Sequence, residues 1–99
     1  MTYYNGEDFD NLIKNGNYLV DFYADWCGPC KMLSSVLEEI DNINIIKVNV
    51  DEYPKLANRF KIMSIPHLIF FSDGKEIDHI VGFVDKETIE EKVSEINNM

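Results

Sequence analysis

The stretch Val20-Asp-Phe-Tyr-Ala-Asp-Trp-Cys-Gly-Pro-Cys-Lys-Met32 contains both cysteines of the chain, Cys27 and Cys30. It begins inside the segment Tyr18 to Ala24, which is short, nearly all apolar and rich in aromatic residues. Such a segment predicts a strand that is buried on both faces of a sheet. From Cys27 to Asn42 apolar residues recur at helical spacing, which predicts a helix. The two cysteines are therefore expected where a strand passes into a helix.

A Cys-x-x-Cys motif at such a junction is typical of a dithiol redox site. Cys27 is expected at the helix N-terminus, where unpaired amides and the helix dipole stabilise a thiolate, the attacking species in disulfide exchange. Cys30 is expected in the first helical turn, close enough to close a small ring with Cys27. Pro29 suits the first turn because its missing N–H would have no partner there. Gly28 leaves the approach to Cys27 sterically open.

Two other kinds of site compete with the redox interpretation. A zinc site needs four ligands, and the only spare candidates are His67 and His79, whose spacing fits no zinc-finger pattern. A structural disulfide across two residues removes little chain entropy and suits a secreted protein better. Spacing and context together favour redox chemistry.

The rest of the chain alternates between helical and strand patterns. The predicted elements are an edge strand near Thr2–Tyr4, a helix capped by Asn5 and ended by Gly16, a buried strand over Ile43–Val50, a short helix opened by Pro54, a β-hairpin of Leu68–Phe71 and Glu76–Gly82 around Asp73-Gly74, and a last helix capped by Asp85. Strands joined through helices must be parallel, whereas the hairpin strands are antiparallel. The sequence therefore predicts an α/β fold with a mixed sheet and helices on both faces.

Length and charge narrow the possible functions. Ninety-nine residues predict a single domain, residues 1–99. The net charge of −9 argues against binding to nucleic acid or to anionic membranes. The longest apolar run, Leu68–Phe71, is far shorter than the ~20 residues of a membrane span. No signal peptide is recognisable, so the expected compartment is the cytoplasm. No large apolar face is left unassigned, so a monomer is expected.

The chain resembles the thioredoxin family over essentially its whole length. The resemblance is carried by Val20–Met32, Lys47–Asp51, Ser64-Ile65-Pro66, Asp73-Gly74 and Gly82. It implies a three-layer α/β/α fold with a central mixed sheet of about four to five strands. It also implies a thiol–disulfide oxidoreductase that reduces the disulfides of client proteins through Cys27 and Cys30. Such a protein is re-reduced by a flavin- and NADPH-dependent thioredoxin reductase and carries no cofactor of its own, and this chain has no Gly-x-Gly-x-x-Gly motif.

Asp21 interrupts a strand that should be buried. A lone buried carboxylate is costly, so its pKa is expected to rise and the group could take and return a proton. The resemblance implies that Asp21 is the general base for Cys30, with Lys47 on a neighbouring strand as its partner, and places both among the catalytic residues. The alternative is that Asp21 and Lys47 form only a structural polar pair.

Ile65 and Pro66 are the third informative element. Most X-Pro bonds are trans, so the residues alone favour a trans peptide. The resemblance implies instead a cis-proline packed against the disulfide, with backbone groups that pair with an extended substrate segment. The implied substrate groove consists of Trp26, Gly28, Pro29, Ile65, Pro66, Gly82 and Phe83. Trp26 has an alternative interpretation as a core aromatic residue.

His67 stands where members of the family usually have threonine. Two interpretations remain open: a cationic imidazole near Cys27 that stabilises its thiolate, or a histidine at the strand edge with no effect on it.

Two alternative functions of the whole chain also remain open. One is an electron donor, oxidant or isomerase with few clients, and the other is a binding module in which redox chemistry is incidental.

Overall fold

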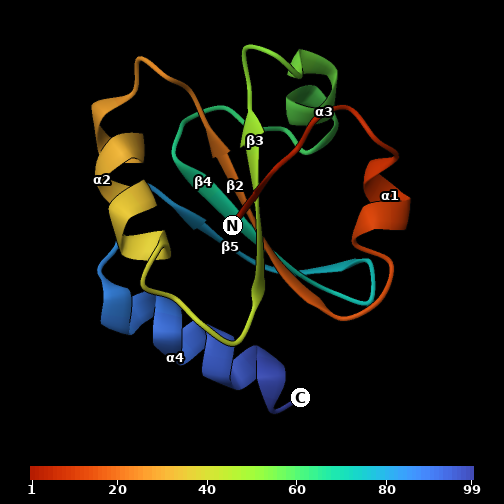
Figure 1. The fold of residues 1–99 in the computed structure, drawn as a ribbon, viewed down its shortest axis with the longest axis vertical. Coiled ribbons are helices and arrows are strands. Elements are labelled where there is room, and N and C mark those ends of the chain that lie inside the picture. Colours follow the sequence, from red (N-terminus) through yellow and green to blue (C-terminus); the bar gives the residue numbers. More distant parts are fainter.

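The computed structural model describes residues 1–99 as a five-stranded mixed sheet with helices on both faces (Figure 1). In chain order the elements are β1 (Thr2–Tyr3), α1 (Phe9–Leu12), β2 (Asn17–Tyr23), α2 (Gly28–Leu37), β3 (Asn44–Asn49), α3 (Pro54–Arg59), β4 (His67–Ser72), β5 (Lys75–Val81) and α4 (Lys86–Asn97). The strand order is β1-β3-β2-β4-β5. Strand β3 pairs in parallel with β1 and β2, whereas β4 is antiparallel to both β2 and β5. This is the predicted α/β/α architecture.

Two apolar clusters fill the space on either side of the sheet. Helices α2 and α4 cover one face and α1 and α3 cover the other (Figure 1). Along the central strand β2, Leu19 belongs to the cluster under α2 and α4, and Val20 and Phe22 belong to the cluster under α1 and α3. Since successive side chains of a strand point to opposite faces, Asp21 lies on the face of Leu19, beneath α2. The prediction of a strand buried on both faces is confirmed.

Three helix boundaries differ from the prediction: the start of α1, its end and the end of α2. The first helix is capped by Asp8 rather than Asn5, because the Asp8 carboxylate accepts a hydrogen bond from the backbone N–H of Asn11 at 3.2 Å. Helix α2 ends at Leu37 rather than Asn42. The chain tightens there, with Ile40 N–H bonded to the Leu37 carbonyl three residues before it, which keeps Ile40 in the core beyond the end of the helix.

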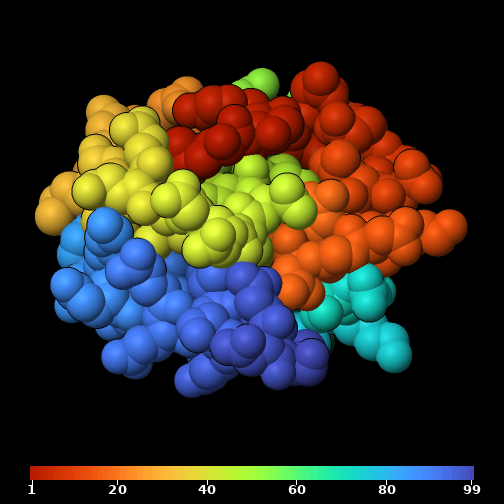
Figure 2. Space-filling view, turned by 60° about the horizontal axis from the view of Figure 1, so that its bottom comes forward, coloured from red at the N-terminus to blue at the C-terminus, as the bar shows by residue number.

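The turn between β4 and β5 lies against the loop before β2. Asp73 and Gly74 both have positive φ, 48° and 82°, as a two-residue hairpin turn requires. The Asp73 carboxylate accepts a hydrogen bond from Gly16 N–H at 2.8 Å, and the Asp73 N–H donates to the Gly16 carbonyl at 2.9 Å. Figure 2 shows this contact as the hairpin tip (cyan) beside the loop that follows α1 (orange). Gly16 therefore makes this contact. The sequence predicted that Gly16 would end the first helix, but α1 ends at Leu12.

None of the four helices combines the length and the apolar composition needed to cross a membrane.

The attachment of α4 can be tested at Ile89, which has no exposed surface in the cluster shared with α2. Replacing Ile89 by alanine leaves a cavity, so Ile89→Ala should lower the free energy of unfolding by about 2–5 kcal/mol in denaturant titrations. Glu90→Ala, at the exposed neighbouring position, is the control and should change stability by less than about 0.5 kcal/mol. Equal effects of the two substitutions would contradict the packing of α4.

Candidate functional site

Cys27 and Cys30 form a disulfide at the start of α2, with their Cα atoms 5.2 Å apart. Cys27 is the N-cap residue of the helix, and its Sγ accepts a hydrogen bond from the backbone N–H of Cys30 at 3.2 Å. Both cysteines are nearly buried, 4% and 2% exposed. A backbone N–H and a helix dipole in this position stabilise a thiolate. Cys27 thus lies at the helix N-terminus, where the sequence predicts the attacking sulfur.

Residues from two later parts of the chain lie beside Cys27. The peptide bond between Ile65 and Pro66 is cis, and the Ile65 carbonyl oxygen lies 3.9 Å from Cys27 Sγ. The Pro66 carbonyl accepts a hydrogen bond from Gly82 N–H at 2.8 Å, which ties the end of β5 to the same place. Phe83, next in the chain, is 44% exposed. The chain around the Ile65–Pro66 bond, 38 positions after Cys27 at Ile65, is thereby brought to the disulfide, together with the end of β5.

Trp26 lies on the surface, which contradicts its interpretation as a core residue. The side chain is 71% exposed, and its indole N–H donates to the Asp51 carboxylate at 2.8 Å. Gly28 and Pro29 are also exposed at the start of α2, and a Cβ added to Gly28 would meet no atom within 4 Å. An apolar ring and an unobstructed backbone therefore border the disulfide.

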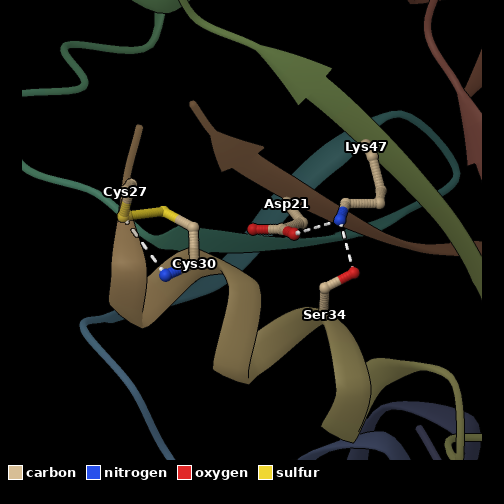
Figure 3. Close-up of polar contacts among 5 residues, drawn as sticks. All are labelled: Asp21, Cys27, Cys30, Ser34 and Lys47. Atoms are coloured by element: carbon tan, nitrogen blue, oxygen red, sulfur yellow. Dashed lines mark hydrogen bonds and ion pairs between the residues drawn. A yellow bond between two sulfur atoms is a disulfide. The ribbon is translucent and has the colours of Figure 1, made fainter. Parts of the chain in front are cut away.

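Asp21 is fully buried beneath α2, between the disulfide and the Lys47 ammonium group (Figure 3). The parallel register of β2 and β3 places Lys47 directly opposite Asp21. The Lys47 Nζ lies 3.8 Å from Asp21 Oδ2, and neither carboxyl oxygen has a hydrogen-bond partner in the protein. Burial raises the pKa of Asp21 to about 6, against the opposing effect of the Lys47 charge. The group can therefore exchange a proton near neutral pH.

Lys47 makes its hydrogen bond to a residue that the sequence analysis did not identify. Its Nζ donates to Ser34 Oγ at 2.7 Å, and it lies 4.5 Å from the centroid of the Tyr23 ring and 5.6 Å from that of Tyr3. Ser34 follows Cys30 by four residues on α2, so both side chains lie on one helix face. That spacing was the available signal, but the bond itself depends on how α2 sits over β3.

His67 is buried and belongs to a short chain of polar side chains on β4 and β5. Its Nε2 lies 2.8 Å from His79 Nδ1, and His79 Nε2 lies 2.9 Å from a Glu76 carboxylate oxygen. Burial lowers the pKa of His67, and the neighbouring His79 adds to that effect. The structure therefore favours a neutral His67 over the cationic residue that would stabilise the Cys27 thiolate.

Neither histidine lies in a metal-binding cluster, because no group of three or more histidine, cysteine, aspartate or glutamate residues is placed to hold a metal ion.

Comparison with known proteins agrees with this geometry. The profile of the family described as Thioredoxin matches residues 1–95. A thioredoxin of Staphylococcus saprophyticus is 50% identical over 91 residues, which cover 87% of this chain and 88% of that protein. A thioredoxin of Chlamydia caviae is 48% identical over 87 residues, covering 84% and 85% of the two chains. The solved structure of a mutant thioredoxin from Halobacterium salinarum has a TM-score of 0.87 and 34% identity, covering 95% of this chain and 88% of the other. With its disulfide at the N-terminus of α2, the chain belongs to the thioredoxin family of oxidoreductases that act on protein disulfides.

Proposed function

We propose that this chain works as a protein-disulfide reductase in which Cys27 attacks and Cys30 resolves. The Cys27 thiolate attacks one sulfur of a client disulfide, forming a mixed disulfide and releasing the other sulfur as a thiolate. The Cys30 thiolate then attacks Cys27 Sγ, which releases the second client sulfur and leaves the Cys27–Cys30 disulfide. Two electrons pass to the client. The observation that carries the proposal is the position of this disulfide as the N-cap of α2.

Asp21 is the general base for the resolving step. The Cys30 thiol loses its proton to the Asp21 carboxylate, and the protonated acid later returns the proton to a departing thiolate. Three observations support this role: the carboxyl group is buried, its two oxygens have no hydrogen-bond partner, and its pKa lies at about 6. A cleft of about 210 Å³ is lined in part by Cys30 and Lys47. Lys47 offsets the charge of ionised Asp21.

The client segment docks beside Cys27. Its backbone pairs with the groups around the cis Ile65–Pro66 bond, and its side chains contact Trp26 and Phe83. Support comes from the exposure of both aromatic rings and from the closeness of the Ile65 carbonyl to Cys27 Sγ. Gly28, Pro29 and Gly82 complete this groove, and a Cβ added to Gly28 or Gly82 would meet no atom within 4 Å.

The reductive cycle needs a second protein. The disulfide must be reduced again after each turnover, and a thioredoxin reductase is the proposed electron source, so this chain itself needs no cofactor. A reductant is useful only where it is kept reduced, which favours the cytoplasm. We propose that residues 1–99 act as a single domain and a monomer.

Substitution of each cysteine tests the order of the two steps. Cys27→Ser should abolish reduction of a disulfide-bonded peptide, because serine does not attack the disulfide. Cys30→Ser should accumulate the mixed disulfide with the peptide, detectable by mass spectrometry, because the resolving sulfur is missing. A mixed disulfide that accumulates in Cys27→Ser instead would reverse the assignment. A binding function would survive the double substitution, and a redox function would not.

The pH dependence of resolution tests Asp21. Protonated Asp21 cannot take the Cys30 proton, so the wild-type rate of resolution should fall as the pH drops through about 6. Asp21→Asn should slow release of the second peptide thiol at pH 7 by about ten- to a hundredfold, and it should lose the dependence near pH 6. The two rates should converge above the ordinary thiol pKa of about 8.5, where Cys30 ionises unaided. An unchanged pH profile would show that Asp21 and Lys47 are only a structural pair.

A further inference from the structure

The Lys47 ammonium group has two partners at unequal distances. Its Nζ is 2.7 Å from Ser34 Oγ, a hydrogen bond, but 3.8 Å from Asp21 Oδ2, which is an ion pair without a hydrogen bond (Figure 3). Lys47 is only 4% exposed. The short contact of this buried cation is therefore with a neutral hydroxyl rather than with the carboxylate that it faces.

The surroundings keep the ammonium group in this position. Ser34 extends from α2 on one side, and the rings of Tyr23 and Tyr3 lie 4.5 and 5.6 Å from Nζ. The opposite neighbour of Asp21 on β4 is Leu68, which offers no polar group. The titratable groups that line the cleft shared by Ser34 and Lys47 are Lys47, Cys30, Tyr3, Tyr23, Asp25 and Lys31. Among them only Lys47 forms an ion pair with Asp21.

The distance between Lys47 and Asp21 determines how strong a base the carboxylate is. An ammonium group that hydrogen-bonds a carboxylate stabilises the ionised form more than a cation farther away. Such a bond would oppose the rise in the pKa of Asp21 that burial causes, and it would occupy a carboxyl oxygen that is now unpartnered. Both changes would weaken Asp21 as the acceptor of the Cys30 proton.

We propose that Ser34 is a positioning residue for proton transfer: its hydroxyl holds Lys47 back from Asp21 and leaves the carboxylate free to accept the proton of Cys30. The inference rests on the proposed role of Asp21 as general base. Ser34 contacts neither sulfur in this scheme and acts only through Lys47. The proton still passes from Cys30 Sγ to an Asp21 oxygen, and no other group is consumed.

Ser34→Ala tests the proposal without disturbing the helix, because alanine has the highest helix propensity. Without the hydroxyl, Lys47 should bond to Asp21. Carbon-13 NMR titration of the Asp21 carboxyl group in the oxidised protein should then show its pKa lowered by about one unit. Single-turnover release of the second thiol from a disulfide-bonded peptide at pH 7 should slow about threefold, with the midpoint of the pH profile shifted downward equally.

Two matched variants control for general effects on α2. Ser35→Ala removes an exposed hydroxyl from the next residue, which makes no hydrogen bond to Lys47, and should behave as wild type. Ser34→Thr keeps a hydroxyl at the same position and should restore the wild-type titration. An unchanged or raised Asp21 pKa in Ser34→Ala would overturn the proposal, as would an equal shift in Ser35→Ala.

The Asp21→Asn background separates this inference from the proposed function. Ser34→Ala added to Asp21→Asn should cause no further loss in the rate of thiol release, since the base is already absent. An additional threefold loss there would contradict the role of Ser34. An unchanged rate in Asp21→Asn alone would contradict the role of Asp21. If Asp21→Asn slows the rate but Ser34→Ala leaves the pKa of Asp21 unchanged, only the role of Ser34 is contradicted.

Discussion

The Asp21 carboxyl group lies in the central strand of the sheet, without exposed surface and without a hydrogen bond. Taking even a neutral polar group out of water with no hydrogen bond in return costs roughly 2–7 kcal/mol, and an unpaired charge costs more. The fold tolerates that cost because β2 is paired on both edges and lies between two apolar clusters. The packing around Asp21 thus retains a buried group that by itself destabilises the fold. Such groups are common at functional sites.

The residues around this carboxyl group come from two neighbouring elements, β3 and α2. The parallel register of β2 and β3 sets Lys47 opposite Asp21, so a cation is available in the same layer. Helix α2 crosses above both residues and contributes at two levels, its N-terminus at Cys27 and its second turn at Ser34. A shift of α2 along its axis would therefore change the thiolate site and the position of the lysine together.

The fold was largely predictable because its signals are periodic. The apolar strands and the amphipathic helix after Cys27 determine layers and strand direction whatever their exact ends. The ends were less predictable: Asp8 and Asn5 are both good caps, and only the folded chain shows which carboxylate or amide reaches a free N–H. The cis bond before Pro66 was implied by resemblance alone, since the residues favour trans.

The site was predictable where it depends on local sequence and not where it depends on packing. The cysteines and Trp26 lie in one continuous motif, and Asp21 stands out as a charge in an apolar strand. The bond between Ser34 and Lys47 joins a helix and a strand whose relative placement no local pattern specifies. The pairing of His67 with His79 likewise depends on the register of β4 against β5.

Trp26 is the only tryptophan of the chain, and it lies one residue before the reactive cysteine with 71% of its surface exposed. All indole fluorescence of this molecule therefore comes from the proposed docking surface beside Cys27. The bond from the indole N–H to Asp51 limits the motion of the ring, so its emission reflects a defined environment. A partner that covers the ring changes the polarity around it. The fluorescence of the unlabelled protein should therefore report the binding of a partner at this position.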